Sequence, residues 1–148
     1  MNFIKQQSIG FYLTVLAVIA AAVGLAFCFI NHGTSTFGNI ALSPVTVAGG
    51  IVAIVLGLVV VVGGQFGTGN AVMRAVVDLS FVIAAVLLVV AAVSFVADRV
   101  NTIASVLSFT QNAQSMADLQ SVIYGGAGLL VAAVLTVLAS YFKVRKAK

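Results

Sequence analysis

Four long apolar runs constrain this chain more than any other feature of its sequence. They cover approximately residues 8–30, 44–63, 71–97 and 118–142. A helix needs about 20 apolar residues to cross the ~30 Å hydrocarbon core of a bilayer. Each run is long enough, and lipid requires the backbone of such a run to pair within its own helix. The sequence therefore predicts an all-α polytopic membrane protein, with residues 1–148 forming a single domain of four transmembrane helices.

The composition supports a surface that is solvated by lipid. The chain is 62% hydrophobic and 7% charged, whereas soluble domains are about 25% charged. A soluble protein of this composition would expose apolar patches well beyond the few hundred Å² that soluble monomers tolerate. The short connections between the runs then favour one antiparallel bundle.

The scarcity of acidic residues excludes several classes of membrane protein. Asp and Glu together number three, and we expect none of them at mid-membrane depth. Asp78 follows the start of the third run, and Asp98 and Asp118 bound the polar segment before the fourth. Pumps, proton-coupled transporters and rotor rings need an ionisable group within the membrane. The sequence therefore argues against all three.

The distribution of basic residues predicts the orientation of the helices. With both termini in the cytoplasm, six Lys and Arg residues are inside and only Arg99 is outside, which follows the positive-inside rule. The six are Lys5, Arg74, Lys143, Arg145, Lys146 and Lys148. We expect the last four to bind anionic lipid headgroups of the cytoplasmic (inner) membrane. No folded basic surface suggests nucleic acid as a partner.

Local signals mark the helix ends. Ser43 and Pro44 are typical of an N-cap and a first helical residue, and the glycine-rich residues 63–70 predict a connector. Residues 115–118 have the spacing of a capping box, which predicts that the fourth helix begins near residue 118. Apolar residues at helical spacing within 100–107 indicate an amphipathic turn at the membrane interface.

Small residues recur in register along the predicted helices, and such residues let helix backbones approach closely in lipid. They pack the bundle internally, or one stripe of them contacts another membrane protein. The third run is richest in β-branched residues and Leu, so we expect it to face lipid most. The candidate interface residues are Gly10, Ala17, Gly24, Gly49, Ala53, Gly57, Gly128 and Ala132.

The sequence offers no constellation of residues for enzyme chemistry. Its single histidine, His32, and single cysteine, Cys28, do not combine with three scattered Asp residues into a catalytic or metal-binding group. We predict a non-enzymatic protein without cofactor or metal, in which Cys28 is a packing residue. The residues we expect to contact a partner from the outer loop are Asp98, Arg99, Asn101, Asn112 and Asp118.

Four segments carry a resemblance to a known group of proteins. They are Ile9–Leu13, Arg99–Asn101, Asn112–Leu119 and Ala139–Phe142. In these segments the chain resembles uncharacterised bacterial four-helix membrane proteins associated with sugar-type ABC importers. The resemblance implies an accessory role and supplies no catalytic or binding residues.

Two functions follow as hypotheses. The first is an accessory or scaffold subunit that docks on a larger membrane complex, such as an ABC-type sugar importer. The alternative is a homo-oligomer that forms a small pore or passive channel, because a single four-helix bundle has too little room for an aqueous path.

Overall fold

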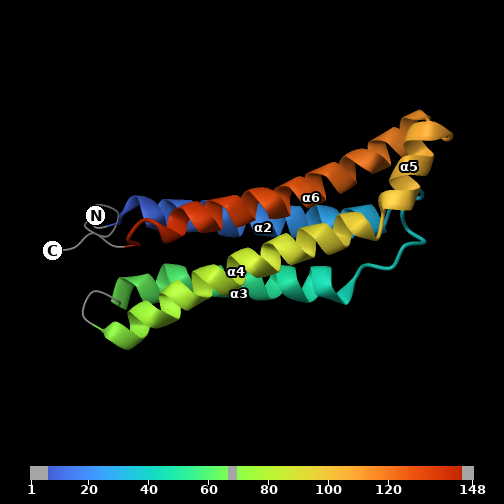
Figure 1. The fold of residues 1–148 in the computed structure, drawn as a ribbon. Helices are drawn as coiled ribbons and strands as arrows, with labels where there is room; N and C mark the ends of the chain where they lie inside the picture. The colour runs from blue at the N-terminus through green and yellow to red at the C-terminus, as the bar shows by residue number, and fades with distance from the viewer. Residues whose placement is uncertain (1–6, 67–69, 145–148) are drawn as a thin grey trace.

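A computed structural model describes residues 7–66 and 70–144 of the chain (Figure 1). Within these ranges every regular element is a helix. Four of the helices are long and apolar enough to cross a membrane, which confirms the prediction of an all-helical protein with four candidate spans. The elements are α2 (Ile9–His32), α3 (Pro44–Phe66), α4 (Ala71–Ala97), α5 (Val100–Ser108) and α6 (Ala113–Ser140).

The long helices form a closed ring. The most extensive contacts join α2 to α6 and α3 to α4, while α4 with α6 and α2 with α3 complete the ring. Figure 1 shows α2 and α6 above α3 and α4, with α5 crossing one end of the bundle. At the other end, the backbone N–H of Ser8 donates to the carbonyl of Val144 at 3.1 Å. The start of α2 and the segment after α6 therefore lie together.

The boundaries of two helices differ from those predicted. The fourth long helix begins at Ala113 rather than at residue 118, because Asn112 and Ser115 form a capping box three residues before the predicted one. The Asn112 side chain accepts from the Ser115 N–H at 2.8 Å, and the Ser115 hydroxyl accepts from the Asn112 N–H at 3.1 Å. As a result Asp118 lies inside α6, where the sequence had placed it in a loop.

The second long helix also extends further than predicted. It includes Gly63 and Gly64 and ends at Phe66, so only part of the predicted connector remains, and residues 67–69 of it lie outside the described ranges. The predicted start of this helix is confirmed. The Ser43 hydroxyl accepts from the N–H of Val45 at 3.2 Å, which caps the first turn beside Pro44.

The prediction that the third run faces lipid most is wrong. In the most apolar 18-residue window of α4, 39% of the residues are buried, compared with 28% in the corresponding window of α3. The physical reason is that α4 packs against both α3 and α6, so its Ala84, Leu88 and Phe95 side chains enter the main core. Large apolar side chains remain exposed on all four long helices, for example Ile19, Val62, Leu79 and Val134, as expected of helices surrounded by lipid.

Candidate functional site: a buried polar cluster at one end of the bundle

The small-residue stripes pack the four helices against one another. The backbones of α2 and α6 approach closely, so that a Cβ added to Gly24 would lie 2.7 Å from the backbone nitrogen of Leu129. A Cβ added to Gly128 would likewise lie 2.7 Å from the Cα of Gly24. Backbone is the neighbour in both cases, so neither position has room for a side chain.

The other stripe residues are also used inside the bundle. A Cβ on Gly10 would lie 2.5 Å from the Phe142 carbonyl oxygen, and one on Gly57 would lie 2.5 Å from a Val18 methyl group. Gly49 is buried facing α4, and Ala17, Ala53 and Ala132 are all buried. Of the two interpretations of the stripes, the structure therefore favours internal packing.

Arg99 is the most unusual residue at the end that carries α5. It stands between α4 and α5 and is fully buried, with 0% of its surface exposed. Its Nε donates to the Asn31 Oδ1 at 2.5 Å, and its Nη1 donates to the Phe95 carbonyl at 3.2 Å. The guanidinium carbon lies 4.2 Å from the centroid of the Phe95 ring. Among the described residues, Nη2 has no hydrogen-bond partner.

Both side-chain hydrogen bonds of this buried cation therefore go to neutral acceptors. Burial lowers the pKa of the Arg99 guanidinium, and electrostatic interactions with Cys28 and then with Asp98 oppose that shift. The ring of Phe95 adds a cation–π contact, which is worth more where water is excluded. A buried charge without a carboxylate partner is costly, so each of these neutral contacts matters for keeping Arg99 inside.

Asn31 links Arg99 to α6. Its side-chain oxygen accepts from Arg99, and its Nδ2 donates to the Ser121 hydroxyl at 2.9 Å and to the Asp118 carbonyl at 3.4 Å. The Ser121 hydroxyl in turn donates to the Asp118 carbonyl at 2.5 Å. One amide side chain therefore joins α2, the α4–α5 junction and α6.

The Asp118 carboxylate fixes the loop of residues 33–43. Its Oδ2 accepts from the Thr36 N–H at 3.1 Å, the Thr36 hydroxyl at 2.6 Å and the Ser35 hydroxyl at 3.2 Å. Its Oδ1 accepts from Gln114 at 2.7 Å. Phe37 from the same loop is buried in the main core. The loop is thus held from both sides, by the carboxylate and by an apolar anchor.

Two of the five predicted outer-loop contact residues are not available at the surface. Arg99 is fully buried and Asp118 is 4% exposed, because both hydrogen-bond inward to other helices or to the loop. The other three, Asp98, Asn101 and Asn112, are exposed. The most exposed large apolar side chain of this region is Phe109, at 86%, which the sequence analysis did not single out.

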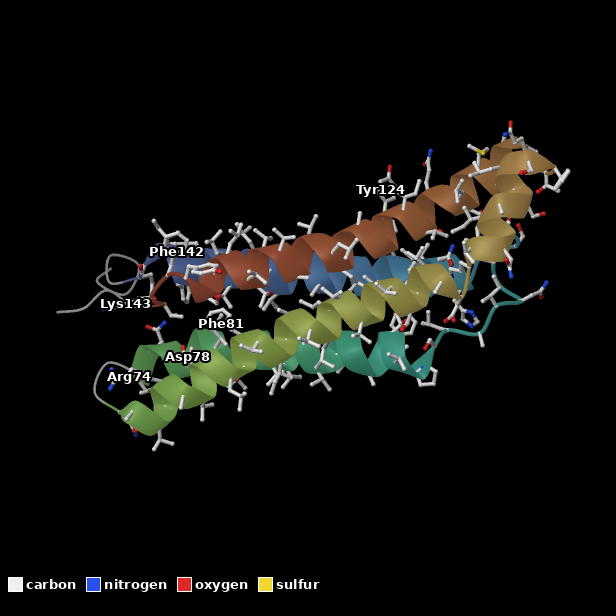
Figure 2. All side chains as sticks on the ribbon, viewed as in Figure 1. Arg74, Asp78, Phe81, Tyr124, Phe142 and Lys143 are labelled. Carbon is white, nitrogen blue, oxygen red and sulfur yellow. The ribbon has the colours of Figure 1, made fainter. Side chains whose placement is uncertain are left out.

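The basic anchor is described only in part. Lys143 is exposed, whereas Arg145, Lys146 and Lys148 lie outside the described residues, as does Lys5. Figure 2 shows Lys143 and Arg74 at the same end of the bundle, opposite the end that carries α5.

Cys28 and His32 are the remaining residues whose side chains could take part in chemistry. Cys28 is free and buried in the main core, in agreement with a packing role. His32 is exposed at the end of α2, with its Nδ1 3.1 Å from the Ile40 carbonyl oxygen. Across residues 7–66 and 70–144, no three His, Cys, Asp or Glu side chains come together as metal ligands. The arrangement as described can donate and accept hydrogen bonds, and the hydroxyls of Ser35 and Thr36 are held by the Asp118 carboxylate.

Comparison with protein families, curated proteins and solved structures finds no match for this chain. The sequence analysis singled out Arg99 and Asp118 of this polar cluster, and it missed Asn31, which links them. The position of Asn31 in the last turn of an apolar run could have indicated a polar network. An amide that is buried there needs hydrogen-bond partners, because burying it without them is costly.

Proposed function

We propose that the chain is a non-enzymatic accessory subunit that docks on a larger membrane complex, such as a sugar-type ABC importer. The proposed contact is the end platform, which comprises residues 33–43, α5 and residues 109–121. The observation that carries this proposal is Phe109, whose ring is 86% exposed on a segment that hydrogen bonds hold in place.

Several hydrogen bonds fix the segment around Phe109. The N–H of Phe109 donates to the Ser105 carbonyl at 2.9 Å, and the Ser115 hydroxyl donates to the Thr110 carbonyl at 2.5 Å. The Gln111 side chain donates to the Leu107 carbonyl at 2.6 Å. An aromatic ring on an ordered segment loses little conformational entropy on binding. Aromatic side chains of this kind are frequent anchors at protein interfaces.

The length of α6 favours a protein partner over lipid tails. Its 28 residues give a helix of about 42 Å at 1.5 Å per residue, longer than the ~30 Å hydrocarbon core. If its other end lies at the membrane surface, the first turns of α6 and the adjoining Phe109 reach headgroup level or beyond. Neutral residues that follow Phe109 in the chain, among them Gln111 and Asn112, are also exposed.

The proposal includes an orientation. We place both termini in the cytoplasm, the four spans antiparallel in the cytoplasmic membrane, and the end platform on the outer side. The exposed Arg74 and Lys143 at the end opposite α5 support this orientation. Anionic headgroups of the inner leaflet are the expected partners of Lys143 and of the basic residues that follow it.

Site-specific photo-crosslinking in membranes of the native host tests the proposal. A photoreactive residue at Phe109 is expected to give one adduct of discrete mass. The same residue at Tyr141 is the control, because Tyr141 is similarly exposed, at 79%, beyond the last residue of α6. We expect Phe109→Ser to abolish co-purification of the crosslinked protein in mild detergent and Tyr141→Ser to leave it intact.

Two results would contradict the accessory role. One is lipid as the only adduct at Phe109, together with recovery of the chain alone in mild detergent. The other is an adduct of the chain with itself, a symmetric oligomer in detergent and ion flux in liposomes, which would support the self-assembling pore instead.

A further inference from the structure

The chain stays on the bundle after α6 ends. It crosses the start of α2, because a Cβ added to Gly10 would lie 2.5 Å from the Phe142 carbonyl oxygen and 2.8 Å from that of Lys143. The backbone N–H of Ser8 then donates to the Val144 carbonyl at 3.1 Å. The crossing segment contributes only backbone atoms to these contacts, so Gly10 provides the room for it.

Val144 extends this crossing to α3. It is 6% exposed and belongs to an apolar cluster separate from the main core. A Cβ added to Gly64 would lie 2.6 Å from the Cβ of Val144, so the valine fills the space that this glycine leaves open. The α2 residues Phe11 and Leu13 pack against the same cluster. Its other buried members come from α3, α4 and α6 and are Val60, Val77, Phe81 and Ala139.

Two glutamine side chains make a second connection between the same elements. The Gln7 Nε2 donates to the Gln65 Oε1 at 3.1 Å, and the Gln65 Nε2 donates to the Gln7 Oε1 at 3.0 Å. Gln7 immediately precedes Ser8, and Gln65 immediately follows Gly64. The start of α2 is thus tied to the end of α3 by residues adjacent to those that contact Val144.

The side of the ring between α2 and α3 is where an additional contact has the most effect. Of the four sides, it has the least extensive helix contact. Helices gain little from packing apolar side chains together inside lipid, whereas burying such side chains is favourable where they would otherwise meet water. The exposed charge of Lys143 indicates that the crossing lies at a level that water reaches.

We propose that residues 142–144 form a C-terminal clamp, which holds the α3–α4 pair against the α2–α6 pair at this end of the bundle. The clamp closes when Val144 enters its cluster beside Gly64. When Val144 is excluded, the two pairs separate at this end. They stay together at the end that carries α5, where the Asn31 side chain of α2 binds Arg99 after α4.

Distances between spin labels, measured by double electron–electron resonance in lipid nanodiscs, test the clamp in a Cys28→Ala background. The reporter pair is Val62→Cys on α3 with Leu138→Cys on α6, close to the clamp. The control pair is Val45→Cys on α3 with Ile123→Cys on α6, toward the end that carries α5. All four positions are exposed. We expect Val144→Asp to shift the reporter pair to longer and more widely distributed distances and to leave the control pair unchanged.

Two further variants separate the clamp from other effects. Gly10→Ala displaces the crossing segment without altering Val144, and it should give the same shift. A chain that ends at Val144 keeps the clamp, and it should keep the wild-type distances. The proposal would be overturned by an unchanged reporter pair in both Val144→Asp and Gly10→Ala, by a shift in the chain that ends at Val144, or by an equal change at the control pair.

Discussion

Arg99 shows at the scale of one residue how a charge is kept inside the protein by neutral groups. A basic residue at the end of an apolar run predicts a solvated position, and the sequence contains no signal against it. Its principal partner, Asn31, lies 68 positions earlier in the chain. Local patterns do not report contacts at such a separation, and the partner is an amide rather than the carboxylate that a charge pattern would have suggested.

Replacing Asn31 alone by Leu should therefore destabilise the protein more than replacing Asn31 and Arg99 together by apolar residues. In Asn31→Leu, the Arg99 Nε loses its acceptor while the charge stays buried. Hydrogen bonds to charged groups contribute about 1.5–3 kcal/mol. The double variant Asn31→Leu, Arg99→Met removes the charge as well, so we expect it to unfold at a higher denaturant concentration than Asn31→Leu alone. A double variant less stable than the single one would show that the buried charge is not the source of the loss.

At the scale of the helices, the sequence predicted the existence of each span better than its ends. Long apolar runs are unambiguous because lipid leaves the backbone no alternative to the helix. The start of α6 was missed because its first two turns contain Gln114, Ser115 and Asp118, polar residues that resemble a loop. Their polar groups are satisfied by the capping box and by the loop of residues 33–43, so the helix can begin among them.

The approach of α2 to α6 predicts which glycine substitutions the bundle rejects. Gly24→Ala and Gly128→Ala each place a methyl group within 2.7 Å of backbone, and overpacking typically costs about 1–3 kcal/mol. We expect both to lower the unfolding midpoint in detergent. Gly33→Ala is the control, because its new Cβ would meet nothing closer than 3.4 Å. Equal midpoints for all three variants would indicate that α2 and α6 are further apart than described.

At the scale of the whole molecule, hydropathy alone predicted a helical protein with four membrane-length helices, and the structure confirms this. The order of the helices around the ring and the polar cluster at its end could not be predicted from the sequence. Both depend on pairing between segments far apart in the chain, such as Asn31 with Ser121 and Gly24 with Leu129. Because small residues lie on several faces of each helix, the sequence did not indicate which helices pack against each other.

Cysteine labelling in cells checks the proposed orientation. In a Cys28→Ala background, Gln111→Cys should react with a membrane-impermeant maleimide on intact cells, whereas Lys143→Cys should react only after permeabilisation. Both positions are exposed in the structure, so access to the reagent decides the result. The wild-type Cys28 is buried and should stay unlabelled under both conditions. Labelling in the opposite order would invert the orientation, and labelling of both in intact cells would contradict four spans.

The hydrogen bond between Arg99 and Asn31 also constrains the order of assembly during biosynthesis. Synthesis from the N-terminus makes Asn31 first and Arg99 68 residues later, so the acceptor exists before the cation that binds it. Ser121 and Asp118 arrive last and close the cluster. Until the guanidinium of Arg99 reaches Asn31, it must stay in contact with water, because a buried charge without partners is costly.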